Sequence, residues 1–278
     1  MNSTRMAFSG LLLSSCISAN AILVTSGTAE FIHSRTCLAQ ADGCIVTGPN
    51  IAYYGGNPGD AASSLSQTIV GHGLGEASSQ LSGTIGAPIH RATSTSFPDV
   101  FFNSQAIALQ SYTYTGAAST TRIFDGTITY SQSMVPLPID IGGVFANILI
   151  FKTSASSLEA GSTSKSNFVA LSNDIYNLPD YIELGSGFYA NSKTTASGNG
   201  AVNVSVSLNP GDTVWVQTIL IASAFNGDII DASHTFVTAW ENGVDLKPAS
   251  TVPDIPTFAL FIVGLVLLAT YWRRNVSL

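Results

Sequence analysis

Apolar and polar residues alternate strictly from Val202 to Leu208, in the order Val-Asn-Val-Ser-Val-Ser-Leu. Successive side chains of a β-strand point to opposite faces, so this pattern predicts a strand with one buried face and one wet face. Asn209 to Asp212 follows as a turn, in which Pro210 fixes φ and Gly211 tolerates positive φ. Thr213 to Ala222 is then a second, more apolar strand. We expect these two strands to form a hairpin packed on a core.

Four other segments also predict extended structure: Gln105–Thr115, Thr121–Gln132, Asp140–Thr153 and His234–Trp240. The last of these is expected to be the final strand. Asp125-Gly126 predicts a tight turn that divides the second segment into two short strands. Val144 to Phe151 is continuously apolar, as expected for a strand covered on both faces. Clusters of Ser, Gly and Asn predict loops at Gly55–Ser66, Ser154–Asn167 and Asn191–Gly200.

The fold class follows from these patterns and from the composition. Hydrophobic residues make up 45% of the 278 residues, which is enough to fill a sizeable core and argues against disorder. Charged residues make up only 10%, so Ser, Thr, Asn and Gly supply most of the surface, which is unfavourable for long surface helices. We therefore expect residues 22–250 to form an all-β body, a two-sheet β-sandwich or jelly roll.

The first 21 residues have the three parts of a secretory signal peptide. Arg5 supplies the charged region, Met6–Ile17 supplies an apolar stretch too short to span a bilayer, and Ala19–Ala21 is a small-x-small cleavage site. Cys16 also fits a bacterial lipobox, which leaves lipidation as the alternative to cleavage after Ala21.

Residues 251–278 are predicted to form a second targeting signal, at the carboxyl end. Val252–Thr257 is a proline-bounded segment, and Phe258–Trp272 is an almost unbroken apolar run. We expect a transmembrane helix over about residues 257–272, followed by Arg273 and Arg274. Because positive charges stay on the cytoplasmic side, the Arg pair predicts that the body lies outside the cytoplasm. This topology agrees with the amino-terminal signal.

The order of motif, apolar helix and arginines resembles the PEP-CTERM sorting signal of exported bacterial proteins, with Val252, Pro253, Asp254 and Pro256 in place of the motif. Two segments of the body, Leu208–Asp212 and Asp231–Phe236, are similar to the carboxyl-terminal strands of many members of that family. The resemblance implies an exosortase as partner and an association with exopolysaccharide or biofilm matrix. This chain departs from the family motif, because it has Asp for Glu and one extra residue before the second proline. A plain membrane anchor is the alternative.

The formal net charge of −7 argues against nucleic acid as a partner, because an acidic body releases no counterions from a phosphate backbone. Neutral glycans, proteins or a metal ion are more compatible partners. Cys37 and Cys44 are the two cysteines that remain after signal cleavage, and an exported chain favours a disulfide between them. A metal site is less favoured, since only His33 lies near them in the sequence.

Motifs for catalysis are absent from the sequence. Gly71–Glu76 contains Gly-x-Gly-x-Glu without the strand and helix that a dinucleotide site requires. Asn226, Asp228 and Asp231 have the oxygens that calcium prefers, but an ordinary turn explains them more simply. The four histidines, His33, His72, His90 and His234, are scattered singly along the sequence. We assign no catalytic residue, no cofactor and no metal site.

These observations favour an exported, non-enzymatic surface or matrix protein of structural or adhesive type, with an uncharged Ser/Thr/Asn face that hydrogen-bonds polysaccharide. Two alternatives stay open. One is a secreted polysaccharide-acting enzyme with a site assembled from dispersed acids. The other is a membrane-anchored lipoprotein.

Overall fold

The computed structural model describes residues 22–24, 26–40, 43–58, 60–82, 87–135, 142–152, 158–160, 182–190 and 196–248. Over these ranges the chain forms β-strands and one short 3₁₀ helix, η2 (Gly243–Asp245). Two large antiparallel sheets contain all but two short strands, β1 and β10. The prediction of an all-β body is confirmed.

The larger sheet has seven strands in the order β11-β9-β13-β7-β2-β3, with β15 also paired to β7. Their bounds are β2 (Ser26–Gln40), β3 (Gly43–Pro58), β7 (Val100–Tyr114), β9 (Gly143–Lys152), β11 (Ile182–Ala190), β13 (Thr213–Phe225) and β15 (Leu246–Pro248). Separately, β1 (Ile22–Val24) pairs with β10 (Leu158–Ala160) in a two-stranded sheet.

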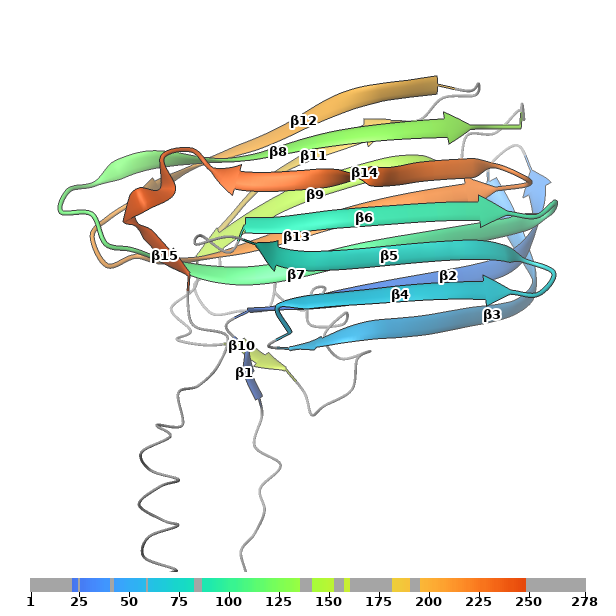
Figure 1. Cartoon of the computed structure of the whole chain (residues 1–278), viewed down its shortest axis with the longest axis horizontal. Helices are drawn as coiled ribbons and strands as arrows, with labels where there is room; N and C mark the ends of the chain where they lie inside the picture. The colour runs from blue at the N-terminus through green and yellow to red at the C-terminus, as the bar shows by residue number, and fades with distance from the viewer. Residues whose placement is uncertain are drawn as a thin grey trace, which may run out of the picture.

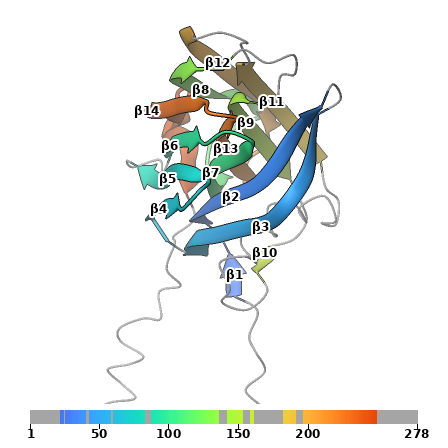
Figure 2. The ribbon, with the colours of Figure 1, turned by 90° about the vertical axis from the view of Figure 1, so that its right-hand side faces the viewer.

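The smaller sheet has six strands in the order β12-β8-β14-β6-β5-β4. Their bounds are β4 (Ala62–Ile69), β5 (Gly73–Ser82), β6 (Ala87–Ser96), β8 (Thr120–Ser133), β12 (Ala196–Leu208) and β14 (Ile229–Trp240). It lies in front of the seven-stranded sheet in Figure 1, and Figure 2 shows the two sheets as separate layers. The predicted two-sheet sandwich is therefore confirmed, although it has more strands than the eight of a jelly roll.

One half of the interior is apolar and draws residues from both sheets. The largest buried side chains of this cluster are aromatic, and they come from β7, β8 and β14: Tyr112, Phe124, Phe236 and Trp240. Trp240 contacts the rings of Tyr112 and Phe124 edge-on, with ring centroids 5.6 and 4.9 Å apart respectively. Burying each such side chain stabilises the fold by about 1.5–3 kcal/mol.

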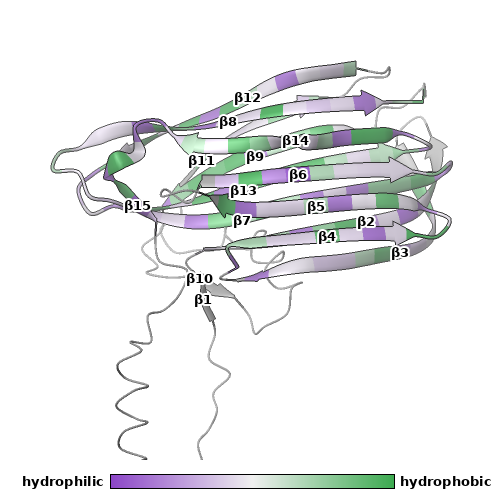
Figure 3. Ribbon diagram, viewed as in Figure 1, coloured by the Kyte–Doolittle hydropathy of each residue, from purple (hydrophilic) through white to green (hydrophobic). Residues whose placement is uncertain are grey.

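The alternation seen in the sequence is visible along the strands, where hydrophobic and hydrophilic residues follow each other (Figure 3). In β12, Val202, Val204, Val206 and Leu208 are buried, while the residues between them are exposed. β9 is buried on both faces near its end, since Ile150 packs in the apolar cluster and Phe151 on the opposite face is also buried. The predictions for both strands are confirmed.

The predicted hairpin between Val202–Leu208 and Thr213–Ala222 is wrong. β12 pairs with β8, whereas β13 pairs with β7 and β9 in the other sheet. The predicted turn exists, with Gly211 at φ 86° and a hydrogen bond from Asp212 N to Asn209 O, but it takes the chain from one sheet to the other. Alternation shows that a strand has one buried face, and it does not identify the neighbour in the sheet.

Two glycine-based predictions are also wrong. Asp125-Gly126 lies inside the continuous strand β8, where Gly126 is buried. A Cβ at this position would overlap the ring of Phe236. The expected loop at Gly55–Ser66 is largely strand, since β3 extends to Pro58 and β4 begins at Ala62. Gly55 is the direct cross-strand partner of Glu30 on β2, and a Cβ there would lie 2.9 Å from Glu30 Oε2. Both glycines serve close packing and not chain reversal.

The remaining boundary predictions are confirmed in part. The expected loop at Asn191–Gly200 ends earlier, because β12 already begins at Ala196, and most of Ser154–Asn167 lies outside the described residues. The strand predicted at His234–Trp240 exists as the second half of β14. It is not the final strand, because β15 follows it.

Candidate functional site

The residues of the predicted carboxyl-terminal targeting signal lie outside the described part of the chain. These are Val252, Pro253, Asp254 and Pro256 of the sorting motif together with Arg273 and Arg274. The amino-terminal signal, residues 1–21, also lies outside it. Within the described ranges, no helical segment combines the length and the hydropathy that crossing a membrane requires.

The two cysteines of the predicted disulfide lie on paired strands, Cys37 on β2 and Cys44 on β3. In the register, Cys37 is opposite Val46 and Cys44 is opposite Ala39, so the two backbone positions are diagonal neighbours in the ribbon. Cys37 is fully buried, whereas the side chain of Cys44 lies outside the described set. The backbone arrangement is compatible with the disulfide, which stays a prediction.

The acidic residues considered for calcium bind backbone amides. Asp228 is buried, and its two carboxylate oxygens accept hydrogen bonds from Val135 N at 2.7 Å and Phe225 N at 3.2 Å. Asp231 accepts one from Ser233 N at 2.8 Å. Over the described residues, no three His, Cys, Asp or Glu side chains gather in a way that could hold a metal ion. The simpler explanation, an ordinary turn, fits these contacts.

The other half of the sandwich interior contains hydrogen-bonded polar residues that no sequence motif marks. Glu30 on β2 is fully buried, and its Oε1 accepts a hydrogen bond from Ser63 Oγ on β4 at 2.7 Å. Ser79 on β5 also interacts with the Glu30 carboxyl and, like Ser63, favours its ionised form. Burial raises the pKa of Glu30 to about 7, although the hydrogen bond from Ser63 acts in the opposite direction. Below about pH 7 this carboxyl is mostly protonated and can donate as well as accept.

His90 lies in the same polar half and connects the two sheets. Its Nε2 lies 2.7 Å from Thr218 Oγ1 on β13, and its Nδ1 lies 3.1 Å from Ser79 Oγ on β5. Complete burial lowers the pKa of His90 to about 3, so the imidazole is neutral. A general base works best with a pKa near the operating pH, and neither Ser79 nor His90 is open to a substrate. The Ser79–His90 contact is therefore part of the packing.

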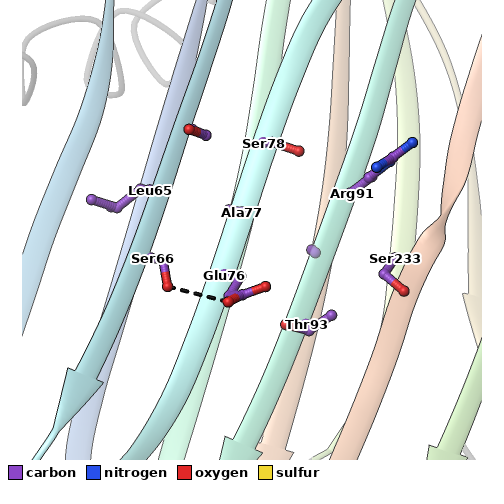
Figure 4. A pocket seen from close by; sticks show the side chains of 10 residues that line it. Leu65, Ser66, Glu76, Ala77, Ser78, Arg91, Thr93 and Ser233 are labelled. Atoms are coloured by element: carbon purple, nitrogen blue, oxygen red, sulfur yellow. Dashed lines mark hydrogen bonds between the residues drawn. The ribbon is translucent and has the colours of Figure 1, made fainter.

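An open groove lies on the outer face of the six-stranded sheet, away from the interior. It has a volume of about 330 Å³ and adjoins a second hollow of about 640 Å³. Its polar lining comes from β4, β5, β6 and β14 (Figure 4), and we call these residues the outer groove: Ser64, Ser66, Glu76, Ser78, Arg91, Thr93 and Ser233. Because outward positions alternate along each strand, the sheet register itself brings these side chains together.

The outer groove has one carboxylate and one guanidinium among hydroxyl groups. Ser66 Oγ donates to Glu76 Oε1 at 3.2 Å, while Arg91 points away from Glu76 (Figure 4). Among the described residues, ion pairs occur elsewhere, at Arg122–Asp245 and Lys152–Asp212. Arg91 therefore has donors to offer to a ligand in the outer groove.

A distortion of β14 borders the outer groove. Ala232 is opposite Ala92 and Phe236 is opposite His90, so β14 has two more residues than β6 over this stretch. Thr235 lies within the extra residues at φ 90°, a conformation that side chains rarely adopt. Bulges of this type are over-represented next to functional sites. The sequence has no signal for this bulge beyond an apolar/polar alternation that Ser233–Thr235 interrupts.

The raised pKa of Glu30 predicts a pH dependence of stability. An unfolded Glu ionises near pH 4.5, whereas folded Glu30 stays protonated until about pH 7, so unfolding becomes easier as the pH rises across this window. The loss is roughly 3 kcal/mol of unfolding free energy. In urea titrations at pH 4.5 and 8, Glu30→Gln should lose less stability than wild type on going to pH 8.

The exposed Glu76→Gln variant is the control and should follow the wild-type dependence. His90 titrates in the opposite sense, since its lowered pKa removes stability as the pH falls below about 6.5, but it is common to all three proteins. An unchanged pH dependence in Glu30→Gln would mean that Glu30 is ionised in the folded protein.

Comparison with known proteins does not identify a family for this chain. No protein-family model matches the chain, and no curated protein sequence matches it. What the protein does must therefore be inferred from its own residues.

Proposed function

We propose that this chain is an exported, non-enzymatic surface or matrix protein whose β-sandwich adheres to neutral polysaccharide through the outer groove. The observation that supports this is the outward face of the six-stranded sheet, where hydroxyl groups surround Glu76 and Arg91. Sugar hydroxyls both donate and accept hydrogen bonds, and a hydroxyl-rich face with one carboxylate and one guanidinium satisfies both needs.

The register makes this face regular. Ser66, Glu76, Thr93 and Asp231 are direct neighbours on β4, β5, β6 and β14 and form one row across the strands. Adjacent strands are about 4.8 Å apart, so the row offers a polar group at short, even intervals to an extended chain. Arg91 and Ser78 begin the next row. An extended polysaccharide lying across the strands would meet one of these groups at each step.

The targeting part of the proposal comes from the sequence. Export by the amino-terminal signal, membrane insertion of the carboxyl-terminal helix and exosortase recognition of the Pro253–Pro256 motif are inferred from the residues there. The body would then lie outside the cytoplasm, and extracellular polysaccharide is available there. Lipidation at Cys16 is the alternative route to the membrane.

One observation favours an enzyme as the second candidate. Glu76 and Asp231 lie on either side of Thr93 in the same row, two strand spacings or roughly 9.6 Å apart along the sheet. Inverting glycosidases hold their two carboxyl groups about 6.5–9.5 Å apart, slightly closer than this backbone spacing. However, Asp231 already accepts a hydrogen bond from Ser233 N. Release of reducing ends from polysaccharide, lost in Glu76→Gln, would favour this candidate.

Substitution in the outer groove tests the adhesive role. Arg91→Ala should weaken binding of the full-length chain to hydroxyethylcellulose, a neutral polysaccharide, by roughly tenfold, because charge-assisted hydrogen bonds contribute about 1.5–3 kcal/mol. Affinity electrophoresis in gels that contain the polysaccharide measures the change. Lys247→Ala, at an exposed position on β15 of the other sheet, is the matched control and should bind as wild type does. Equal retardation of both variants would contradict the proposal.

Processing of the tail is tested separately. Co-expression with an exosortase should remove the peptide that follows the motif, and mass spectrometry of the mature carboxyl end measures this. Replacing Pro253 and Pro256 by Ala should leave the tail attached, while Arg273→Ala should not. A tail that is retained in strains with and without the exosortase would favour the plain anchor.

A further inference from the structure

A row of aromatic and neutral side chains crosses the outer face of the seven-stranded sheet, on the side opposite the outer groove. In the order of the strands from β3 to β11 its members are Tyr54, Phe31, Gln105, Ile221, Phe145 and Tyr189. Each is the direct cross-strand partner of the next, so we call this set the aromatic row. It uses all six strands of the main path of this sheet, whose order can be followed in Figure 2.

The side chains of the aromatic row point away from the interior. Ile32 beside Phe31 on β2 and Ala222 beside Ile221 on β13 are fully buried between the sheets, so Phe31 and Ile221 face outward. Tyr54 and Tyr189, at the two ends, are 37% and 56% exposed. The rings of Phe31 and Tyr54 have centroids 5.0 Å apart, and those of Phe31 and His33 are stacked at 5.7 Å.

The arrangement is that of a long platform with rings at both ends. Five strand spacings of about 4.8 Å give it a length of roughly 24 Å. A hollow of about 500 Å³ adjoins Phe145 at the β11 end, where Gly185 and Gly187 have no side chains to fill the space beside Asn147. A groove end next to exposed rings can receive a flat ligand that extends along the aromatic row.

Charge identifies the class of ligand. The aromatic row contains no Asp, Glu, Lys or Arg. The two neighbouring rows, Ala52–His33–Asn103–Ser223 and Gly56–Ala29–Ile107–Ile219–Asn147–Gly187, contain none either, and the middle of the second row is covered, since Ala29 and Ile107 are fully buried. Burial lowers the pKa of His33, which keeps it neutral at pH 7. Within these three rows an ionic ligand would find no counter-charge, and the nearest charged side chain described on this face, Arg35, lies over the ring of Phe101. A neutral ligand needs no counter-charge.

From this geometry we infer that the aromatic row binds one extended chain of a neutral polysaccharide, with the C–H faces of its pyranose rings stacked on the aromatic side chains. The π-faces of Phe and Tyr are negative and attract the slightly positive C–H edges of a sugar. Gln105 and Asn147 supply amide groups for the sugar hydroxyls. This site shares no residue with the outer groove and does not rest on it, but both sites can engage the polymer at once, so the loss of either one weakens the overall binding. With both sites occupied, one molecule would bridge two polysaccharide chains.

The test uses the full-length chain and two polymers with the same backbone, neutral hydroxyethylcellulose and anionic carboxymethylcellulose. The double variant Tyr54→Ala/Tyr189→Ala should bind the neutral polymer at least about fourfold more weakly, since each of the two lost stacking contacts contributes a factor of about two to twelve. Tyr54→Phe/Tyr189→Phe keeps the rings and should bind as wild type does. Both residues are exposed, so a matched urea midpoint should confirm that the variants are folded.

Arg91→Ala distinguishes the two sites. If Arg91→Ala weakens binding and the double tyrosine variant does not, the inference about the aromatic row is overturned, whereas the proposed role of the outer groove is kept. Stronger binding of wild type to the anionic polymer than to the neutral one would also overturn it. Sedimentation velocity measures the oligomeric state and tests whether the aromatic row is a dimer interface. If the double variant abolishes a dimer and leaves polysaccharide binding unchanged, the aromatic row is an interface with a second copy of this chain.

Discussion

The interior shared by the two sheets is the constraint on which every outer surface of this protein depends. Phe124, Phe236 and Trp240 can be buried only if their strands present even-numbered positions to the other sheet. The side-chain period of a strand is two, so fixing the inner face also fixes the outer one. The outer groove and the aromatic row are therefore consequences of core packing. A register slip of one residue would turn each of them inward.

The polar half of the interior imposes a second condition. Glu30 and His90 lie where the two sheets meet, and each would be costly to bury without hydrogen bonds. Ser63 satisfies one oxygen of Glu30, and Thr218 reaches His90 from the opposite sheet. Such contacts are directional, so they specify the alignment of the sheets more narrowly than apolar packing does. Burial favours the neutral forms of both side chains: it raises the pKa of Glu30 to about 7 and lowers that of His90 to about 3.

The sequence predicted individual strands better than it predicted their partners. The alternation from Val202 to Leu208 and the apolar run from Val144 to Phe151 both correspond to observed strands. Their positions in the sheets could not be inferred, because alternation reports burial of one face and contains no information on distant neighbours. Gly126 shows the same limit. Its role is to make room for Phe236, a residue far along the chain, and a local pattern suggests only a turn.

The candidate sites were hidden from sequence reasoning for a related reason. An uncharged Ser/Thr/Asn face was expected from the composition, but Glu76 and Arg91 come together only through the pairing of β5 with β6. The aromatic row gathers residues from six strands spread over most of the body. Neither set has a spacing in the chain that marks it as a unit. The sequence could have shown only which residues share a face within each single strand.

Cross-strand nuclear Overhauser effects in the folded protein test the central claim, the register of the seven-stranded sheet, most directly. We predict backbone contacts between Phe31 and Gln105 and between Phe145 and Ile221, which place all four side chains on the outer face. Contacts of Phe31 with Ser104 or Ala106 in their place would mean that the register is shifted by one residue. The aromatic row would then not exist, and the account of the outer face of the seven-stranded sheet would be contradicted.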